Sequence, residues 1–272
     1  MLDLSQPVVM GVLNVTPDSF SDGGRFVDVD AAVQHAVAMA EAGAGILDVG
    51  GESTRPGAGA VGEQEEIDRT APVIEALAKR VSTPISIDTS KPAVMRAALQ
   101  VGAVMINDVR ALRERGALEE AARSGAAICL MHMQGEPRTM QHEPRYVDVV
   151  ADVCEFLAAR VRACQEAGVA GERLVIDPGI GFGKRLEHNL ALLAGVPQLV
   201  ALGPPVLIGV SRKSMFGELL KRPVHERLAG GLAIAAAAVL AGADLVRTHD
   251  VRETVDAVKV AAALRDACYR IE

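Results

Sequence analysis

Hydrophobic and polar positions follow two alternating patterns along the whole chain. Short apolar runs rich in β-branched residues indicate strands, and the Ala-rich stretches between them indicate helices. The strands are expected near 8–15, 46–50, 84–88, 104–109, 127–132, 174–177, 206–211 and 245–249. The helices are expected near 30–42, 63–80, 92–101, 114–124, 146–167, 187–202, 224–241 and 252–268. The pattern therefore predicts eight consecutive β–α units.

The connections at the two ends of these units differ. Most helix-to-strand joints are short, and Gly43, Gly102, Gly125, Gly168 and Gly242 stand where a helix C-cap needs a left-handed residue. Several strand-to-helix connections are much longer, namely 16–28, 51–62, 133–145 and 212–223. Long Gly/Pro-rich connections on one rim place function at the C-terminal ends of the strands.

We interpret the chain as an α/β protein, a single (β/α)8 TIM barrel that spans residues 1–272, because no composition shift or linker divides it. A doubly wound parallel sheet is the alternative. Such a sheet usually has fewer strands and reverses its strand order at a switch point, so the barrel is favoured.

Composition and net charge exclude some classes of binding partner. The net charge of −7 argues against nucleic acid or an anionic membrane surface. No secretory leader is visible, and the four cysteines lack C-x-x-C spacing, so we expect free thiols and a cytoplasmic protein. The uncharged run 228–243 is dominated by Ala and Gly, which favours a buried, tightly packed helix over a membrane span.

Polar residues stand at the predicted strand ends, where a barrel carries its chemistry. A single one of them is most simply a hydrogen-bonded rim residue, but eight strand ends converge on one mouth. In chain order the ends carry Asn14, Asp48 and Glu52, Asp88, Asn107 and Asp108, His132, Asp177, the run 211–213, and Arg247, His249 and Asp250.

The stretch "IDPGIGFGK" (176–184) lacks the spacing of a phosphate-binding P-loop, and its acid would repel phosphate. The carboxylate of Asp177 suits a ligand with adjacent N–H donors, such as an amino-pyrimidinone edge. Asp88 and Asn107 add acceptors and a donor, and Lys213 can donate to a ring carbonyl or nitrogen. The stretch therefore predicts a site for a flat heterocycle.

The signal for a polyanion comes from other strand ends. "NVTPDSFSDGG" (14–24), "GGESTRPG" (50–57) and "RTHD" (247–250) bring Asn14, Arg55, Arg247 and His249 to the same rim. Three potential cations and one amide oxygen suit a polyanion together with Mg²⁺.

Some of these residues allow a second interpretation. Phe182 fits either the core or a ligand wall, and His132 fits either rim packing or the site lining. Lys213 could be the Schiff-base lysine of a barrel aldolase. The run "GEQEEIDR" (62–69) is most simply an exposed acidic first helical turn.

Eight motifs together resemble the dihydropteroate synthase family: "NVTPDSFSDGG", "GGESTRPG", "SIDTSKP", "INDV", "LMHMQG", "IDPGIGFGK", "GVSRKS" and "RTHD". They occur in family order from residue 14 to 250. The resemblance implies the condensation of 6-hydroxymethyl-7,8-dihydropterin pyrophosphate with 4-aminobenzoate, which gives 7,8-dihydropteroate and pyrophosphate. It also implies a homodimer.

The resemblance assigns roles residue by residue. The pterin readers would be Asp88, Asn107, Asp177 and Lys213, and Asn14 would contact Mg²⁺. The pyrophosphate would be held by Arg55, Arg247 and His249. The wall for 4-aminobenzoate would be formed by Thr54, Pro56, Phe182 and Ser214, with Phe20 and Asp22 on the first loop. The catalytic set would be Asp88, Asp177, Lys213, Arg247 and His249.

An electron-rich dihydropterin can stabilise a cation at the carbon that carries the pyrophosphate, so departure of the leaving group can precede attack by the amine. Such a reaction needs charge stabilisation and orientation more than a general base. Two other functions stay open: a related pterin-binding barrel that transfers a methyl group from a folate, and a paralogue that binds pterin without turnover.

Overall fold

The computed structural model describes residues 3–16, 28–53, 59–136 and 139–268. Within these ranges eight parallel strands form one sheet in the order β6-β5-β4-β3-β2-β1-β8-β7. An isolated parallel bridge between Ile176 and Val206 joins the two ends of the sheet, which therefore forms a nearly closed barrel. The strands are β1 (Val8–Asn14), β2 (Ile46–Gly50), β3 (Ile85–Asp88), β4 (Met105–Asp108), β5 (Ala127–Met131), β6 (Leu174–Asp177), β7 (Leu207–Gly209) and β8 (Leu245–Thr248).

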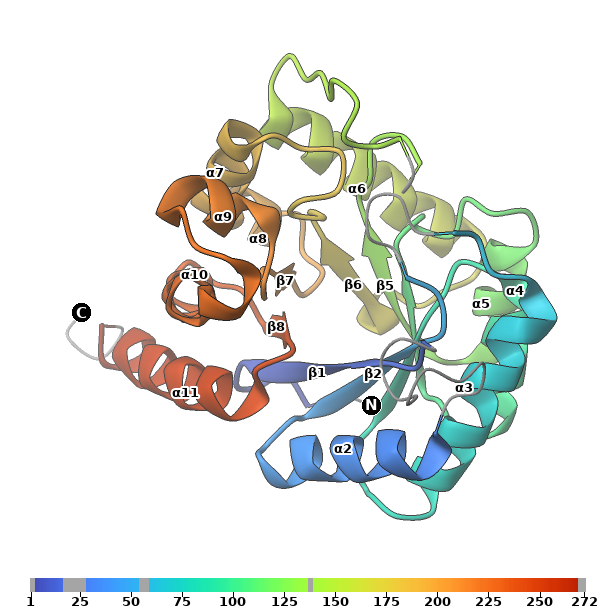
Figure 1. Ribbon diagram of the computed structural model, residues 1–272. Helices are drawn as coiled ribbons and strands as arrows, with labels where there is room; N and C mark the ends of the chain where they lie inside the picture. Colours follow the sequence, from blue (N-terminus) through green and yellow to red (C-terminus); the bar gives the residue numbers. More distant parts are fainter. Residues whose placement is uncertain (1–2, 17–27, 54–58, 137–138, 269–272) are drawn as a thin grey trace.

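Helices surround the strands (Figure 1). The α-helices are α2 (Val29–Glu41), α3 (Glu63–Ala78), α4 (Pro92–Gln100), α5 (Ala117–Ser124), α6 (Val149–Glu166), α7 (Leu186–Ala194), α8 (Val196–Val200), α9 (Ser214–Leu220), α10 (Leu228–Leu240) and α11 (Val251–Cys268), and the 3-10 turns are η1 (Gly171–Arg173) and η2 (Val224–Glu226). The predicted TIM barrel is confirmed, and each predicted strand contains or coincides with an observed one. The five glycines predicted at helix C-termini all have positive φ.

Three predicted boundaries are wrong. The helix expected at 187–202 is two helices, because the chain turns at Gly195 and a new short helix begins at Val196, with Pro197 in its first turn. The connection expected at 212–223 contains α9, which begins directly after Lys213. The helix expected at 224–241 is the 3-10 turn η2 followed by α10.

Another expectation also fails at the start of α3. The acidic run 62–69 was expected to be an exposed first turn, but Glu66 is fully buried. Its neighbours Glu63 and Glu65 are exposed, so the turn has one buried acid on the barrel side. The uncharged run at 228–243 is helix α10, and none of the helices in the described ranges is long and apolar enough to span a membrane.

The interior of the barrel is divided into an apolar and a polar part. Successive strand residues face opposite sides, so residues two apart share the interior face. The lower part, which we call the barrel floor, is a buried cluster of Met10, Ile46, Met105, Cys129, Val175, Leu207 and Leu245. Two residues after four of these come Asp48, Asn107, Asp177 and Arg247, nearer the C-terminal ends of the strands. These four and Asp88, which pairs in register with Asn107, form what we call the polar layer.

Candidate functional site

The polar layer is held together by the guanidinium of Arg247 on β8. Its Nε donates to Asp48 Oδ2 at 2.7 Å and its Nη2 donates to Asp88 Oδ2 at 2.8 Å. Asn107 donates from Nδ2 to the same Asp48 oxygen at 2.9 Å. Strands β2, β3, β4 and β8 thus meet in one hydrogen-bonded network across the barrel mouth.

Burial dominates the electrostatics of this network. Loss of solvent raises the pKa of Asp88 to about 7, and the neighbouring Asp48 adds to the rise while Arg247 opposes it. The carboxylates of Asp48 and Asp88 raise the pKa of Arg247, against the effect of burial, so the guanidinium stays charged. Within the described residues, Asp48 Oδ1 and Ser86 Oγ are buried without a hydrogen-bond partner. The layer therefore retains hydrogen-bonding capacity for a ligand.

Asp177 ends β6 and faces the mouth from the opposite side. Its Oδ1 accepts a hydrogen bond from the backbone N–H of Gly179 at 2.7 Å. Burial raises the pKa of Asp177, while Lys213 and the Gly179 hydrogen bond act in the other direction. The side chain is only 6% exposed. This carboxylate is therefore fixed in orientation and placed to accept from a ligand.

Lys213 precedes α9 and reaches across to the loop after β6. Its Nζ donates to the carbonyl of Ile180 and lies 4.7 Å from the centre of the Phe182 ring. Burial lowers the pKa of Lys213 to about 8, although Asp177 favours the charged form. Phe182 is half-buried against a cluster of Met131, Met133 and other apolar residues, so both of its predicted roles, packing and lining, are compatible with its position.

The lysine that ends the "IDPGIGFGK" stretch, Lys184, is buried. Its Nζ donates to the carbonyls of Gly179 and Phe182 at 2.9 and 3.0 Å, and it lies 3.0 Å from His132 Nδ1. Burial and the nearby Lys184 lower the pKa of His132 to about 3. The ring is therefore neutral, and its Nδ1 accepts a hydrogen bond from Lys184 Nζ. Lys184 therefore pins the loop from within, and His132, which also packs edge-on against Phe156, supports it.

The other side of the mouth is formed by the ends of β7 and β8. Ser211 Oγ lies 3.1 Å from His249 Nδ1 and 3.3 Å from Asp250 Oδ2. Asp250 also pairs with Arg212, whose φ of 60° is in the left-handed region. Hydrogen bonds and one ion pair thus position His249 at the rim. In the described structure Arg247 contacts the carboxylates of the polar layer, so it lies with the expected pterin readers.

Asn14 ends β1 and is half-buried at the same mouth. A metal held there would need oxygen ligands, and Asn14 offers one amide oxygen. The described residues contain no group of three or more His, Cys, Asp or Glu side chains that could hold a metal ion. This donor set fits Mg²⁺ that takes most of its ligands from substrate phosphates and water.

The structure thus brings together Asn14, Asp88, Asn107, Asp177, Phe182, Lys213, Arg247 and His249 at the C-terminal mouth of the barrel, with Ser214 exposed at the start of α9. The remaining expected residues, Phe20, Asp22, Thr54, Arg55 and Pro56, lie outside the described residues. Asp48 and Lys184 were missing from the expected set. The spacing of Asp48 from the apolar Ile46 on one strand face could have identified it.

Comparisons with known proteins agree with this geometry. A family described as "Pterin binding enzyme" matches residues 10–249. The chain is 54% identical to a dihydropteroate synthase of Escherichia coli K12 over 98% of this chain and 94% of that one. It is 50% identical to one of Haemophilus influenzae over 98% and 97%.

Solved structures show the same likeness. A Yersinia pestis dihydropteroate synthase with a sulfonamide drug complex superposes with a TM-score of 0.93 at 52% identity, covering 97% of this chain and 96% of that one. A Xanthomonas albilineans dihydropteroate synthase in complex with 7,8-dihydropteroate gives 0.89 at 49% identity, covering 97% and 95%.

Proposed function

The chain belongs to the pterin-binding enzymes and, within them, to the dihydropteroate synthases, transferases of folate biosynthesis; from this premise we propose which residues carry out each part of the reaction. The substrates are 6-hydroxymethyl-7,8-dihydropterin pyrophosphate and 4-aminobenzoate, and the products are 7,8-dihydropteroate and pyrophosphate. The observation that carries the assignment is the polar layer, in which buried carboxylates and one amide surround Arg247 above an apolar floor.

We assign the pterin ring to this layer. Asp177 accepts from adjacent N–H groups of the ring, and Asn107 and Asp88 bind its other polar edge. The unpartnered Asp48 Oδ1 supplies one more acceptor. Lys213 gives up its contact with the Ile180 carbonyl and donates to a ring carbonyl or nitrogen. The carboxylates also favour a ring that carries positive charge.

The pyrophosphate binds at the β7 and β8 side, where His249 donates to it. Arg247 contributes its positive charge from the polar layer, which borders this side. Arg55 completes the set of pyrophosphate-binding residues. Asn14 would hold Mg²⁺, which would neutralise phosphate charge when bound. The carbon–oxygen bond breaks with its electron pair going to pyrophosphate, and the amine of 4-aminobenzoate then bonds to that carbon and loses a proton to water.

Pyrophosphate release, measured with and without 4-aminobenzoate, tests the reaction. The proposal is supported if pyrophosphate is released, 7,8-dihydropteroate is formed, and both events require both substrates. A methyl-transferring relative would release no pyrophosphate, and a non-catalytic paralogue would bind the pterin without release; either result contradicts the proposal.

The order of bond breaking has its own test. Substrate labelled with oxygen-18 in the bridge between carbon and phosphorus is incubated with the enzyme and benzoate, which lacks the attacking amine. If departure precedes attack, the label moves into non-bridging positions of the recovered substrate. A label that stays in the bridge would indicate a concerted displacement.

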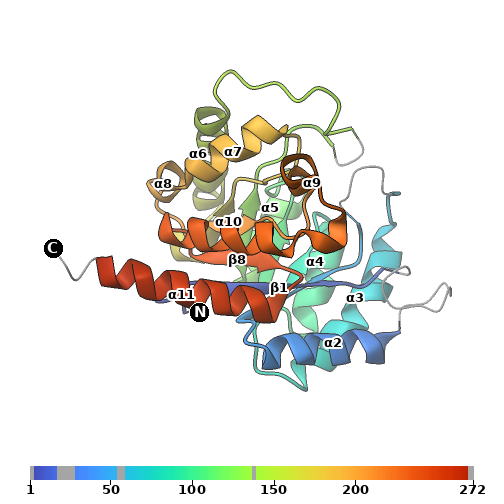
Figure 2. The same cartoon turned by 60° about the vertical axis from the view of Figure 1, so that its left-hand side comes forward.

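We also propose a cytoplasmic homodimer. Helices α10 and α11 pack side by side at the surface (Figure 2), and both expose large apolar side chains. These are Leu228 and Leu240 on α10, and Val260 and Leu264 on α11. A Cβ added at Gly231 on α10 would meet no atom within 4 Å, so this face is open in the monomer. Exposed apolar residues gathered on two neighbouring helices are typical of an interface between subunits.

A further inference from the structure

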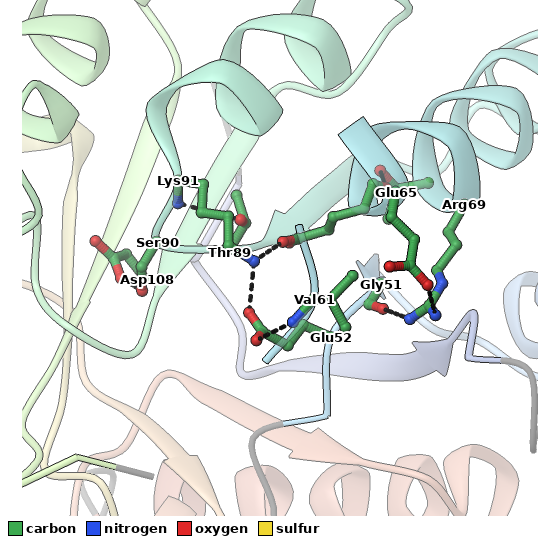
Figure 3. A network of polar contacts seen from close by, with 11 residues as sticks. Gly51, Glu52, Val61, Glu65, Arg69, Thr89, Ser90, Lys91 and Asp108 are labelled. Atoms are coloured by element: carbon green, nitrogen blue, oxygen red, sulfur yellow. Dashed lines mark hydrogen bonds and ion pairs between the residues drawn. The ribbon is translucent and has the colours of Figure 1, made fainter. Parts of the chain in front are cut away.

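The two described ends of the connection between β2 and α3 are tied to each other by one side chain. Glu52, two residues after β2, accepts a hydrogen bond at Oε1 from the backbone N–H of Val61 at 3.0 Å. Val61 lies just before α3. Figure 3 shows this contact, which closes the connection at its base independently of the residues between its ends.

The other oxygen of Glu52 is tied to a neighbouring unit of the barrel. Lys91, which precedes α4, donates from Nζ to Glu52 Oε2 at 2.7 Å and to Glu66 Oε2 at 2.5 Å. The Glu66 side chain is 1% exposed, whereas Lys91 and Glu52 are 21% and 29% exposed. One ammonium therefore bridges a buried carboxylate on α3 and a partly exposed carboxylate on the connection.

Burial and hydrogen bonding have opposite effects on the pKa values of Glu66 and Lys91. Burial raises the pKa of Glu66, and its hydrogen bond from Lys91 opposes the rise. Burial alone would lower the pKa of Lys91, but its hydrogen bonds to Glu52 and Glu66 outweigh this and raise it. Lys91 follows the pterin reader Asp88 by three residues, so the bridge links the end of β3 with the base of the neighbouring connection.

Two further contacts hold the β2 side of the same connection. Arg69 on α3 donates from Nη1 to the carbonyl of Gly51 at 2.8 Å. A Cβ at position 51 would lie 2.7 Å from Thr70 Cγ2 and 3.0 Å from Glu66 Cγ, so the backbone passes as close to α3 as a glycine allows. The base of the connection is therefore a built and ion-paired structure.

We propose that Glu52 and Lys91 are positioning residues for the second substrate, 4-aminobenzoate, because they tie together the two described ends of the β2–α3 connection. This inference rests on the proposed function and on the family resemblance, which assigns Thr54 and Pro56 of that connection, both outside the described residues, to the 4-aminobenzoate wall. Within the described residues, Glu52 hydrogen-bonds to Val61 and Lys91 and to no member of the polar layer.

The test is steady-state kinetics of Glu52→Ala. In this variant Lys91 keeps Glu66 as its partner, so no buried charge is left alone. The KM for 4-aminobenzoate should rise at least fivefold, while the KM for the pterin pyrophosphate stays within twofold. Glu52→Gln keeps an oxygen that accepts from Val61 but loses the ion pair, so its KM for 4-aminobenzoate should lie between those of wild type and Glu52→Ala.

Glu75→Ala is the matched control, because Glu75 is an exposed acid on α3 whose partner within the described residues is Lys79. Its KM values should equal those of wild type. Lys91→Arg, which keeps the charge, should recover most of the wild-type KM, whereas Lys91→Met should not.

Wild type must first release pyrophosphate in a 4-aminobenzoate-dependent way, and if it does not, the proposed function itself fails. If wild type is active and Glu52→Ala has an unchanged KM for 4-aminobenzoate, or raises both KM values in parallel, the positioning role is wrong.

Discussion

The guanidinium of Arg247 lies between two carboxylates, so its removal would leave Asp48 and Asp88 without their shared counter-charge. Sequence motifs assign Arg247 to the pyrophosphate alone, together with His249. The contacts place it within the polar layer, to which we assign the pterin. An uncompensated buried carboxylate is costly to a protein, and it protonates or rearranges when its partner is lost. Substitutions of Arg247 and of His249 should therefore have different effects on ligand binding.

Arg247→Ala should weaken binding of the unphosphorylated pterin alcohol and of the pterin pyrophosphate, whereas His249→Ala should weaken only the latter. A hydrogen bond to a charged group contributes about 1.5–3 kcal/mol, so we expect at least a tenfold loss for the alcohol in Arg247→Ala, which is about 1.4 kcal/mol. Calorimetric titration of both ligands measures it. Unchanged affinity of Arg247→Ala for the alcohol would return Arg247 to the pyrophosphate side alone.

Lys184 makes the free energy of unfolding depend on pH. Burial lowers its pKa to about 7, against 10.5 for the unperturbed side chain. Between these values the unfolded chain binds more protons at Lys184 than the folded chain does, so stability due to this residue rises with pH. Below about pH 7 both states are protonated, and the contribution becomes constant.

Lys184→Met should remove that slope. The difference in unfolding free energy between wild type and this variant should shift in favour of wild type by up to about 1.4 kcal/mol per pH unit between pH 7.5 and 9. Urea denaturation at several pH values gives the comparison, and titrating groups that do not interact with Lys184 cancel in the difference. Parallel pH profiles for the two proteins would show that Lys184 keeps an ordinary pKa.

Sequence reasoning at the residue scale was limited by partners far away in the chain. Asp48 was recognised as a strand-end acid, but its partner Arg247 is 199 positions further on. Lys184 looked like the end of a ligand loop, and only the folded loop turns the carbonyls of Gly179 and Phe182 toward it. Asp88, Asn107 and Asp177 could be found because period-two alternation places each at an interior strand end.

At the scale of elements, the loop between β6 and α7 depends on backbone that only glycine adopts without strain. Gly179, Gly181 and Gly183 all have positive φ. A Cβ on Gly179 would collide with the carbonyl oxygen of His132, and the N–H of Gly179 also orients Asp177. The loop therefore couples a steric requirement to the orientation of the pterin-reading carboxylate.

Gly179→Ala should lower both stability and pterin affinity. Gly168→Ala is the control, because Gly168 has φ of 87° but no atom within 4 Å of an added Cβ. A residue held in the left-handed region costs on the order of 1–3 kcal/mol, and Gly179→Ala should exceed the control by the cost of the collision. Thermal and urea unfolding measure both variants. Equal losses of stability in the two variants would mean that the loop can move away from His132 at no cost in free energy.

The strands could be predicted from sequence because their apolar runs are bounded by turns, while helix boundaries were less predictable. Ser214 to Leu220 form α9 inside what looked like a rim connection, since seven residues are too few for a clear helical period. Glu66 was expected in solvent because acids are common in first turns. Its burial follows from Lys91, a partner on another unit that the local pattern does not contain.

For the whole molecule, the apolar surface of α10 and α11 carries the proposed dimer. Val260 is 62% exposed on α11, and Val260→Asp should shift the protein from dimer to monomer in analytical ultracentrifugation, because a buried unpaired carboxylate opposes association. Val104→Asp is the control: Val104 is 49% exposed but precedes β4, away from α10 and α11. A protein that sediments as a monomer before substitution, or a Val260→Asp variant that remains dimeric, would contradict this interface.

Strands β6 and β7 are joined by an isolated bridge, and the proposed pterin position spans the junction between them. Ile176 is bridged to Val206 and donates its N–H to the carbonyl of Pro205 at 2.9 Å, whereas every other pair of neighbouring strands has a ladder of registered pairs. Asp177 lies at the end of β6, and Lys213 lies on the other side of the junction, after β7. Under the proposed assignment, a pterin bound by both side chains would link the end of β6 to the segment that follows β7, in addition to being the substrate. Hydrogen exchange at the Ile176 amide, whose bond to Pro205 crosses this junction, should then be slower in the pterin complex than in the free protein.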